Sequence, residues 1–179
     1  MLTPLFASGL FRLAPRASRL TVAAILCAAL AACGFKLRGT AMLPFDSMYV
    51  QAAPTSQFAV QLKRAVASGS QTRVAANPVE AQVVLQVLNE LREKHILSLS
   101  GGGRVREFQL RYRIFYRLTD NKSALEHIPS TEIVLHRDFA FNDNEALAKE
   151  AEEALLFRDM QDDAVQQLVR RLQVAKLKS

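Results

Sequence analysis

Residues 104–118, RVREFQLRYRIFYRL, carry the clearest pattern in the sequence and predict a long β-strand. Apolar side chains occupy every second position: Phe108, Leu110, Tyr112, Ile114, Tyr116 and Leu118. Apart from Phe115, the positions between them are polar or charged: Glu107, Gln109, Arg111, Arg113 and Arg117. Because successive side chains of a strand point to opposite faces, this alternation predicts one apolar and one basic face.

The preceding residues predict a partner for this strand. Ala81–Ser100 is a long extended stretch that begins with the apolar run VVLQVL, and Gly101–Gly103 separates it from the strand quoted above. Two long strands joined by glycines are typical of a β-hairpin. A phosphate-binding loop is disfavoured, because no helix and no GK[ST] ending follow the glycines.

The segment before the hairpin predicts one strand and one helix. Residues 45–52 (FDSMYVQA) predict a strand that stops at Pro54. A helix is expected from Thr55 or Ser56 to about Ser68, because its apolar residues recur at helical spacing: Phe58, Leu62, Ala65 and Val66.

The segment after the hairpin predicts a fourth strand and a long last helix. A turn at Asp120–Ser123 is followed by Pro129, which we expect to break the chain before a strand over Thr131–Phe141. A cap within residues 142–144 then starts a helix from about Glu145 to Val174. The order β-α-β-β-β-α predicts an α+β, two-layer sandwich: a four-stranded, mainly antiparallel sheet with two helices on one face.

The first residues are typical of an export signal. Met1 to Leu20 contains three arginines and no acid, and residues 20–30 (LTVAAILCAAL) form an apolar or small run. This run is too short to cross a bilayer as a helix, which takes roughly 20 apolar residues. It ends in Leu30-Ala31-Ala32-Cys33-Gly34, which has the form of a lipobox. In such a motif the thiol of Cys33 takes a diacylglyceryl group, and the chain is cut before it.

We therefore predict a lipoprotein signal peptide over residues 1–32, a lipidated tether over 33–44 and one periplasmic domain over 45–179. The acyl chains on Cys33 would anchor the protein to a membrane. Gly34 stands where aspartate typically retains a bacterial lipoprotein at the inner membrane, so the periplasmic side of the outer membrane is expected. The alternative is an ordinary secretory signal in which Cys33 is incidental.

Loss of the signal peptide changes both the charge and the cysteine content. The formal net charge of +6 includes the three arginines of the signal, so the composition does not predict a nucleic-acid partner. Cys27 would be removed with the signal, and Cys33 would be acylated. No thiol then remains for a disulfide or a cysteine-ligated metal.

No catalytic constellation is recognisable in the sequence. No serine lies in a nucleophile elbow. The acidic residues early in the last helix are typical of a solvated helix face: Glu150, Glu152 and Glu153. The histidines lack the spacing of a metal site: His95, His127 and His136. We therefore expect no enzymatic activity, no cofactor and no metal.

Basic residues gather near the glycines and along the polar strand face: Arg104, Arg106, Arg111, Arg113 and Arg117. Within this stretch only Glu107 opposes them. One interpretation is a charged, solvated sheet face. The other is a surface for phosphate groups, because arginine binds phosphate through a planar fork of donors. In a periplasmic lipoprotein, lipopolysaccharide is the abundant phosphate-bearing ligand, and both interpretations stay open.

The mature sequence resembles the LptE family of lipopolysaccharide-assembly lipoproteins, also called rare lipoprotein B. The opening Cys33–Gly39 (CGFKLRG) is similar to the family's CG-aromatic-x-LRG start. The strand segments 106–110 and 112–118 match it less specifically. The last helix resembles the family over residues 142–150 and 163–172.

This resemblance implies an α+β fold and a non-enzymatic subunit of the outer-membrane lipopolysaccharide translocon. Family members lodge in the lumen of the LptD β-barrel, assist its assembly and contact lipopolysaccharide. The resemblance implies such a contact for Lys149 at the start of the last helix, and for Arg104 or Arg106 near the hairpin tip, where this chain has glycines. Arg111, Arg113 and Arg117 would meet either barrel carboxylates or lipid phosphates.

Two other functions are compatible with the sequence. One is a free periplasmic lipoprotein that binds a lipid or an anion, which would need a closed apolar pocket. The other is an assembly or pilot lipoprotein of a different outer-membrane machine.

Overall fold

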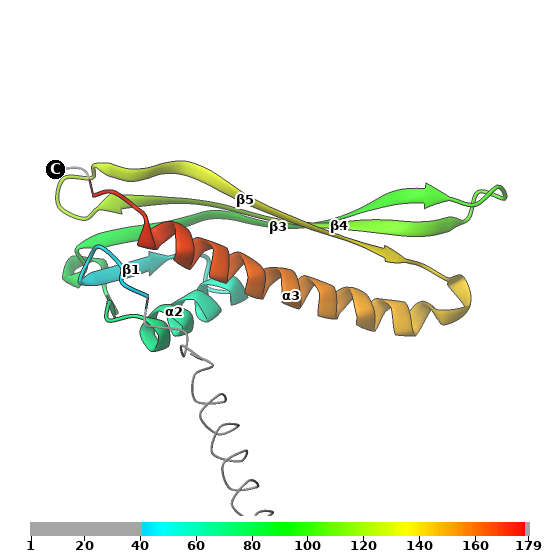
Figure 1. The fold of residues 1–179 in the computed structure, drawn as a ribbon, viewed down its shortest axis with the longest axis horizontal. Coiled ribbons are helices and arrows are strands. Elements are labelled where there is room, and N and C mark those ends of the chain that lie inside the picture. Colours follow the sequence, from blue (N-terminus) through cyan, green and yellow to red (C-terminus); the bar gives the residue numbers. More distant parts are fainter. Residues whose placement is uncertain (1–40, 178–179) are drawn as a thin grey trace, which may run out of the picture. The chain divides into compact units, whose positions relative to one another are not determined.

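The computed structural model of the protein describes residues 41–177. The predicted signal peptide, the lipidation site Cys33, the CGFKLRG opening and most of the predicted tether lie outside the described residues. Among residues 41–177, the chain forms these elements in order (Figure 1): β1 (Ser47–Gln51), α2 (Gln57–Gly69), β2 (Arg73–Val74), the 3-10 turn η1 (Pro78–Glu80), β3 (Val83–Leu99), β4 (Val105–Asp120), β5 (Glu126–Ala140), the 3-10 turn η2 (Asp143–Glu145) and α3 (Ala146–Gln173).

The predicted hairpin is confirmed as β3 and β4, which pair antiparallel from Val83 opposite Asp120 to Leu99 opposite Val105. Gly103 lies in the connecting turn with a φ of 76°, a conformation that favours glycine. The predicted apolar face of β4 is buried, with exposed fractions of 0–1% from Leu110 through Leu118 at alternate positions. Burial of each such side chain stabilises the fold by about 1.5–3 kcal/mol, so a one-residue slip of the register would be costly.

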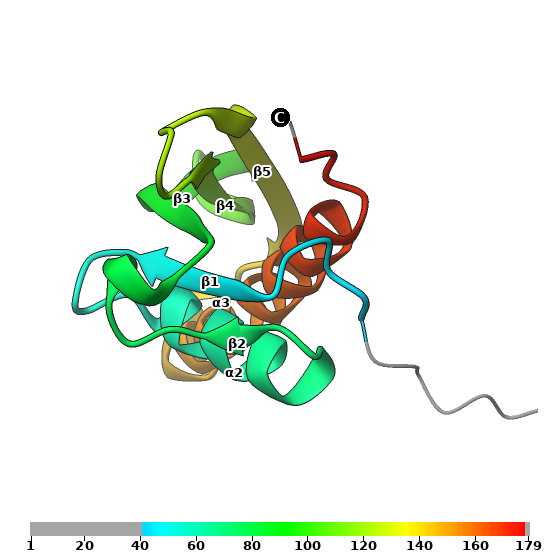
Figure 2. The same cartoon turned by 90° about the vertical axis from the view of Figure 1, so that its left-hand side faces the viewer.

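The prediction of a four-stranded, mainly antiparallel sheet is wrong. The described residues form a five-stranded mixed sheet in the order β2-β1-β3-β4-β5. β1 pairs parallel with both β2 and β3, because the chain crosses over through α2 before it returns to the sheet. Figure 2 shows β1 and β2 from the end of the sheet opposite the β3–β4 turn. β2 has only two residues, too few to give an alternating pattern in the sequence.

The two predicted helices are confirmed, and both lie on one side of the sheet (Figures 1 and 2). α2 begins after Ser56, whose side chain accepts a hydrogen bond from the Ala59 amide as an N-cap. α3 buries Phe157, Met160 and neighbouring residues against the apolar faces of the strands. One core therefore joins α2, α3 and the inner face of the sheet.

The expected break at Pro129 is also wrong, since β5 runs through it from Glu126 to Ala140. β5 is the edge strand of the sheet, and its pairing with β4 is irregular beside this proline, between Tyr116 and Leu118. Proline lacks a backbone N–H, so it is tolerated on an edge strand at a bulge.

The β4–β5 turn is closed by one carboxylate. Asp120 accepts hydrogen bonds from the Ser123 amide at 2.7 Å, the Ser123 hydroxyl at 2.8 Å and the Lys122 amide at 2.9 Å. The bonds from Ser123 lower the pKa of Asp120 most, with further lowering from Lys122 and His127. A lowered pKa means that the ionised carboxylate stabilises the folded state.

We expect Asp120→Asn to lower the free energy of unfolding at neutral pH but not in strong acid. Because folding depresses the pKa, the wild-type advantage is complete above the ordinary aspartate pKa of about 3.9 and is lost as pH falls through the lower folded value. Denaturant unfolding of both proteins across this range measures the difference. Asp162→Asn, at an exposed position on α3, is the control. An equal effect of Asp120→Asn at every pH would contradict this role.

Candidate functional site

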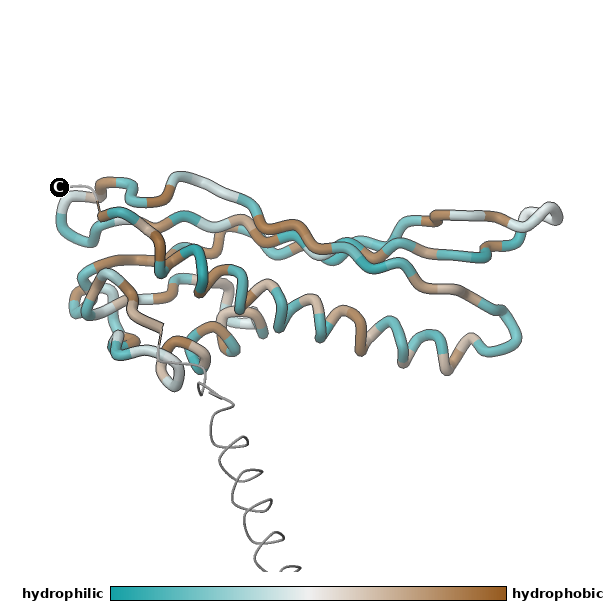
Figure 3. Tube along the Cα trace, in the orientation of Figure 1, coloured by the Kyte–Doolittle hydropathy of each residue, from teal (hydrophilic) through white to brown (hydrophobic). Residues whose placement is uncertain are grey.

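The tip of the β3–β4 hairpin combines exposed apolar side chains with two arginines. Ile96, Leu97 and Leu99 are 57%, 48% and 56% exposed, and Figure 3 shows apolar segments on this part of the hairpin. Arg104 and Arg106 are also exposed, and neither side chain forms an ion pair within residues 41–177. The tip therefore offers an apolar surface next to two unpaired cations.

Lys149, the third predicted basic residue, lies in the first turns of α3. Its side chain is 17% exposed, and its Nζ atom lies 2.8 Å from a carboxylate oxygen of Glu152. Figure 1 shows the start of α3 at the same end of the sheet as the β3–β4 turn. No interaction between Lys149 and either hairpin arginine is found within the described residues.

An aromatic cluster with a lysine at its centre lies on the sheet near the β3–β4 turn. The Phe108 ring stacks on Phe139 with centroids 5.8 Å apart and meets the edge of Phe141 at 5.1 Å. The Nζ atom of Lys94 lies 4.2 Å from the centroid of Phe108 and 2.5 Å from a carboxylate oxygen of Glu153. Lys94 was not predicted from the sequence, because its place opposite Leu110, on the side of the sheet that faces the helices, depends on the register of β3 with β4.

The outer face of the sheet carries more acids than the strand pattern indicated. Carboxylates from β3 and β5 lie beside the predicted arginine row: Arg111 and Arg113 flank Glu93 at 3.9 and 3.6 Å, Arg113 also bonds Glu132, and Arg117 lies 3.6 Å from Glu126. The hydrogen bond to Glu132 is the main cause that raises the pKa of Arg113. These three arginines are therefore already paired within the domain, unlike Arg104 and Arg106.

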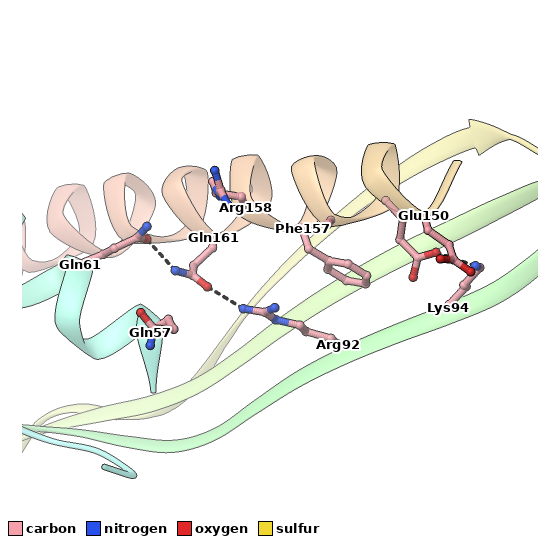
Figure 4. A pocket seen from close by; sticks show the side chains of 10 residues that line it. Gln57, Gln61, Arg92, Lys94, Glu150, Phe157, Arg158 and Gln161 are labelled. Atoms are coloured by element: carbon pink, nitrogen blue, oxygen red, sulfur yellow. Dashed lines mark hydrogen bonds and ion pairs between the residues drawn. The ribbon is translucent and has the colours of Figure 1, made fainter. Parts of the chain in front are cut away.

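A groove opens between β3, α2 and α3 (Figure 4). It has a volume of about 750 Å³ and is lined mainly by polar side chains. Arg92 donates to the Gln161 amide oxygen at 2.7 Å, and the Gln161 amide donates to Gln61 at 2.8 Å. The guanidinium of Arg92 also lies 5.8 Å from the Phe157 ring centroid. This chain of contacts joins the sheet to both helices.

A neighbouring groove of about 580 Å³ shares Gln57 and Arg92 with the first, so the two adjoin. Glu90 lies in it and accepts hydrogen bonds from the Ser56 hydroxyl at 2.8 Å and the Tyr112 hydroxyl at 2.6 Å. Burial and then Glu90 raise the pKa of Tyr112, so this phenol stays protonated and donates to Glu90. The two contacts fasten the N-terminus of α2 to β3 and β4.

In residues 41–177 no group of three or more His, Cys, Asp and Glu side chains is placed to hold a metal ion. Within the same residues, no helix is both long and apolar enough to cross a membrane.

The chain matches the family model described as "LptE: Lipopolysaccharide-assembly" over residues 45–172. It is 29% identical to the LPS-assembly lipoprotein LptE of Yersinia enterocolitica over 153 residues, which cover 80% of this chain and 70% of the relative. It is also 29% identical to the protein of that name from Pectobacterium atrosepticum, over 79% of this chain and 77% of the relative.

Solved structures show the same fold. The solution structure of "uncharacterized lipoprotein B" from Nitrosomonas europaea has 41% identity and a TM-score of 0.68, and the match covers 78% of this chain and 90% of that one. The rare lipoprotein B of Shewanella oneidensis, at 21% identity and a TM-score of 0.58, covers 70% of this chain and 92% of that one and supports the fold alone.

Ser56→Ala should lower the free energy of unfolding by about 1–2 kcal/mol, because it removes a helix N-cap and one hydrogen bond to Glu90. Urea unfolding of the domain over residues 45–179 measures the loss. The control is Ser68→Ala in the same helix, where the exposed hydroxyl bonds only the Arg64 carbonyl and the change should stay within about 0.5 kcal/mol. Equal losses of unfolding free energy in the two variants would show that the Ser56 side chain does not stabilise the fold through its N-cap and its bond to Glu90.

Proposed function

The chain belongs to the LptE family of lipopolysaccharide-assembly proteins, and from this premise we propose that it is a non-enzymatic subunit of the outer-membrane lipopolysaccharide translocon. In this role it plugs the LptD β-barrel, assists the assembly of the barrel and contacts lipopolysaccharide during insertion into the outer leaflet. Its relatives carry the name LPS-assembly lipoprotein.

The hairpin tip is the observation that supports contact with lipopolysaccharide. Lipopolysaccharide presents acyl chains and phosphate groups close together on lipid A. The tip presents Ile96, Leu97 and Leu99 as exposed apolar side chains and Arg104 and Arg106 as unpaired guanidinium groups. Guanidinium binds phosphate through paired donors, and the apolar side chains favour contact with acyl chains.

The outer face of the sheet supports a position inside a barrel. The lumen of an outer-membrane barrel is polar. Arg111, Arg113 and Arg117 alternate there with carboxylates from the neighbouring strands, which gives a face of both charges. Such a face remains hydrated against polar walls, while the apolar face of the sheet stays covered by α3. Because its arginines are already paired within the domain, this row fits a polar barrel wall better than lipid phosphates.

Anchoring at the outer membrane completes the proposal. Residues 1–32 act as the signal peptide, Cys33 carries the lipid, and residues 33–44 tether the domain over 45–179 to the periplasmic side of the membrane. Several acyl chains on one residue give nearly permanent membrane attachment.

The alternative of a free lipid carrier has less support. Such a carrier needs a closed and largely apolar pocket. In residues 41–177 the two grooves described above are open and lined mainly by polar side chains, among them Gln57, Gln61, Glu90 and Arg92.

Detergent extraction of membranes that contain the full-length protein should yield a stable complex with the LptD-type barrel of the same bacterium. Depletion of the protein should reduce lipopolysaccharide at the cell surface, which labelling of intact cells measures. A protein that elutes free of the barrel, with surface lipopolysaccharide unchanged on depletion, contradicts the proposed function. Loss of a different secreted product would instead favour an assembly lipoprotein of another machine.

Arg106→Asp should weaken binding of purified lipopolysaccharide by about tenfold, because a charged hydrogen bond contributes about 1.5 kcal/mol or more and is replaced by repulsion. Lys149→Asp should act in the same direction. Arg106 is exposed, and Lys149, although paired with Glu152, lies outside the hydrophobic core, so both variants should remain folded, which thermal unfolding checks. Lys63→Asp, at an exposed position of α2, is the control for net charge. If all three variants bind equally, the predicted contact is wrong.

A further inference from the structure

One edge of β3 has no strand beside it over most of its length. β1 pairs with β3 only at Val83–Gln86, and the chain leaves the sheet after Gln51. From Asn89 to Ile96, β3 pairs with β4 on one side without a register shift. Within residues 41–177 no strand pairs with the other side of this stretch.

The backbone groups that face this open edge can be identified from the register. The Phe141 amide donates to the Arg106 carbonyl, so Arg106 bonds β5. β4 and β5 pair without a shift from Glu107 to Tyr116, and hydrogen-bonded residues alternate along an antiparallel strand. The residues of β4 that bond β3 are therefore the odd-numbered ones, such as Arg111 and Arg113.

It follows that Leu91 and Glu93, the partners of Arg113 and Arg111, bond β4. The residues between and beside them turn their N–H and C=O groups to the open edge: Glu90, Arg92, Lys94 and Ile96. A further contact agrees with this alternation of inward and outward backbone groups: the Glu90 amide donates at 2.9 Å to the side chain of Asn89 and not to β4.

The other edge of the sheet is protected in ways that β3 is not. On β5, Arg171 donates to the outward carbonyl of Glu132 at 3.0 Å, and Pro129 interrupts the ladder. Natural sheets commonly blunt their edges by such devices to prevent pairing with other chains. Within residues 41–177 no side chain donates to the backbone oxygens of Arg92, Lys94 or Ile96.

The space beside the open edge is the double groove described above. Arg92 lies in both parts of it, and Gln57 forms part of the α2 side (Figure 4). The groove holds carboxylates as well as cations: Glu153 pairs with Lys94, and Glu150 lies near Lys94, farther along the groove from Arg92 (Figure 4). The carboxylate nearest to Arg92, Glu90 at 3.8 Å, already accepts two hydrogen bonds, and Arg158 on α3 forms no ion pair within the described residues. A strand that passes here meets unpaired backbone groups and a site for an acidic side chain.

We propose that β3 accepts an added strand: an extended segment of the partner polypeptide pairs with the open edge at Glu90–Ile96 and places an acidic side chain beside Arg92. This inference rests on the proposed function, in which the partner is the outer-membrane barrel protein. Addition of a strand recognises the main chain through backbone hydrogen bonds, and side-chain pockets supply the specificity. A second copy of the chain, paired antiparallel with Arg92 or Glu93 at the centre, would place Arg92 opposite Arg92 or Lys94, which are like charges.

Hydrogen–deuterium exchange resolved at single residues tests the inference on the detergent-extracted complex and on the free protein. The amides of Arg92, Lys94 and Ile96, and the Glu90 amide that is bonded only to the Asn89 side chain, should exchange faster than their β4-bonded neighbours in the free protein and at least about tenfold more slowly in the complex. The amides of Leu91 and Glu93, already bonded to β4, are internal references and should be slow in both. Fast exchange of the four amides in an intact complex overturns the inference but leaves the proposed function standing. Failure to form any complex overturns both.

A backbone variant provides an independent test. Ile96→Pro removes one outward N–H and no bond to β4, and it should weaken the complex by about tenfold or more. Val134→Pro makes the same change on β5, where the outward-facing residues are the even-numbered ones, and should leave the affinity unchanged. Both side chains are exposed, at 57% and 45%, and circular dichroism confirms folding. Equal affinities of the two variants, or slow exchange of the four amides in a self-associated free protein, contradict a partner strand.

Discussion

The antiparallel pairing of β3 with β4 is the interaction on which the rest of this domain depends. It holds two strands of 17 and 16 residues in one register, with the apolar face of β4 toward the helices. That register decides which side chains reach α3 and which reach the outer face. The two paired strands also extend beyond the first residues of α3, so the hairpin tip is exposed (Figure 1). Core, outer face and tip therefore all follow from one ladder of backbone hydrogen bonds.

The inner faces of the two strands differ in kind. β4 contributes Leu110, Tyr112 and Ile114 to the core, whereas the residues of β3 opposite this face, Glu90, Arg92 and Lys94, stay partly exposed outside the core. Charged groups that are partly removed from water are costly unless they are bonded, and each of these three has partners on α3, on β4 or at the N-cap of α2. These charges keep β3 partly hydrated, which leaves a polar groove and an open strand edge where a fully apolar strand would have been covered.

The charges of the domain divide into paired and unpaired groups. On the outer face, the arginines of β4 meet carboxylates of β3 and β5, and such exposed pairs contribute little to stability. At the tip, Arg104 and Arg106 have no carboxylate partner within the described residues. The cations available to an anionic partner are therefore the unpaired arginines of the tip. On the outer face, by contrast, the arginines and carboxylates neutralise one another.

Local patterns in the sequence determined the elements that depend on neighbouring residues. Alternation predicted β4, helical spacing and a capping serine predicted α2, and the glycine run predicted the hairpin turn, because each is set within a few residues. Pairing between distant segments was decided only by the tertiary structure. The parallel β1–β3 pair, the two-residue β2, the passage of β5 through Pro129 and the meeting of Arg113 with Glu132 all depend on which strands lie side by side. The sequence alone does not encode strand order locally, so the mixed sheet, the paired outer face and the open edge of β3 appeared only once the strands were placed together.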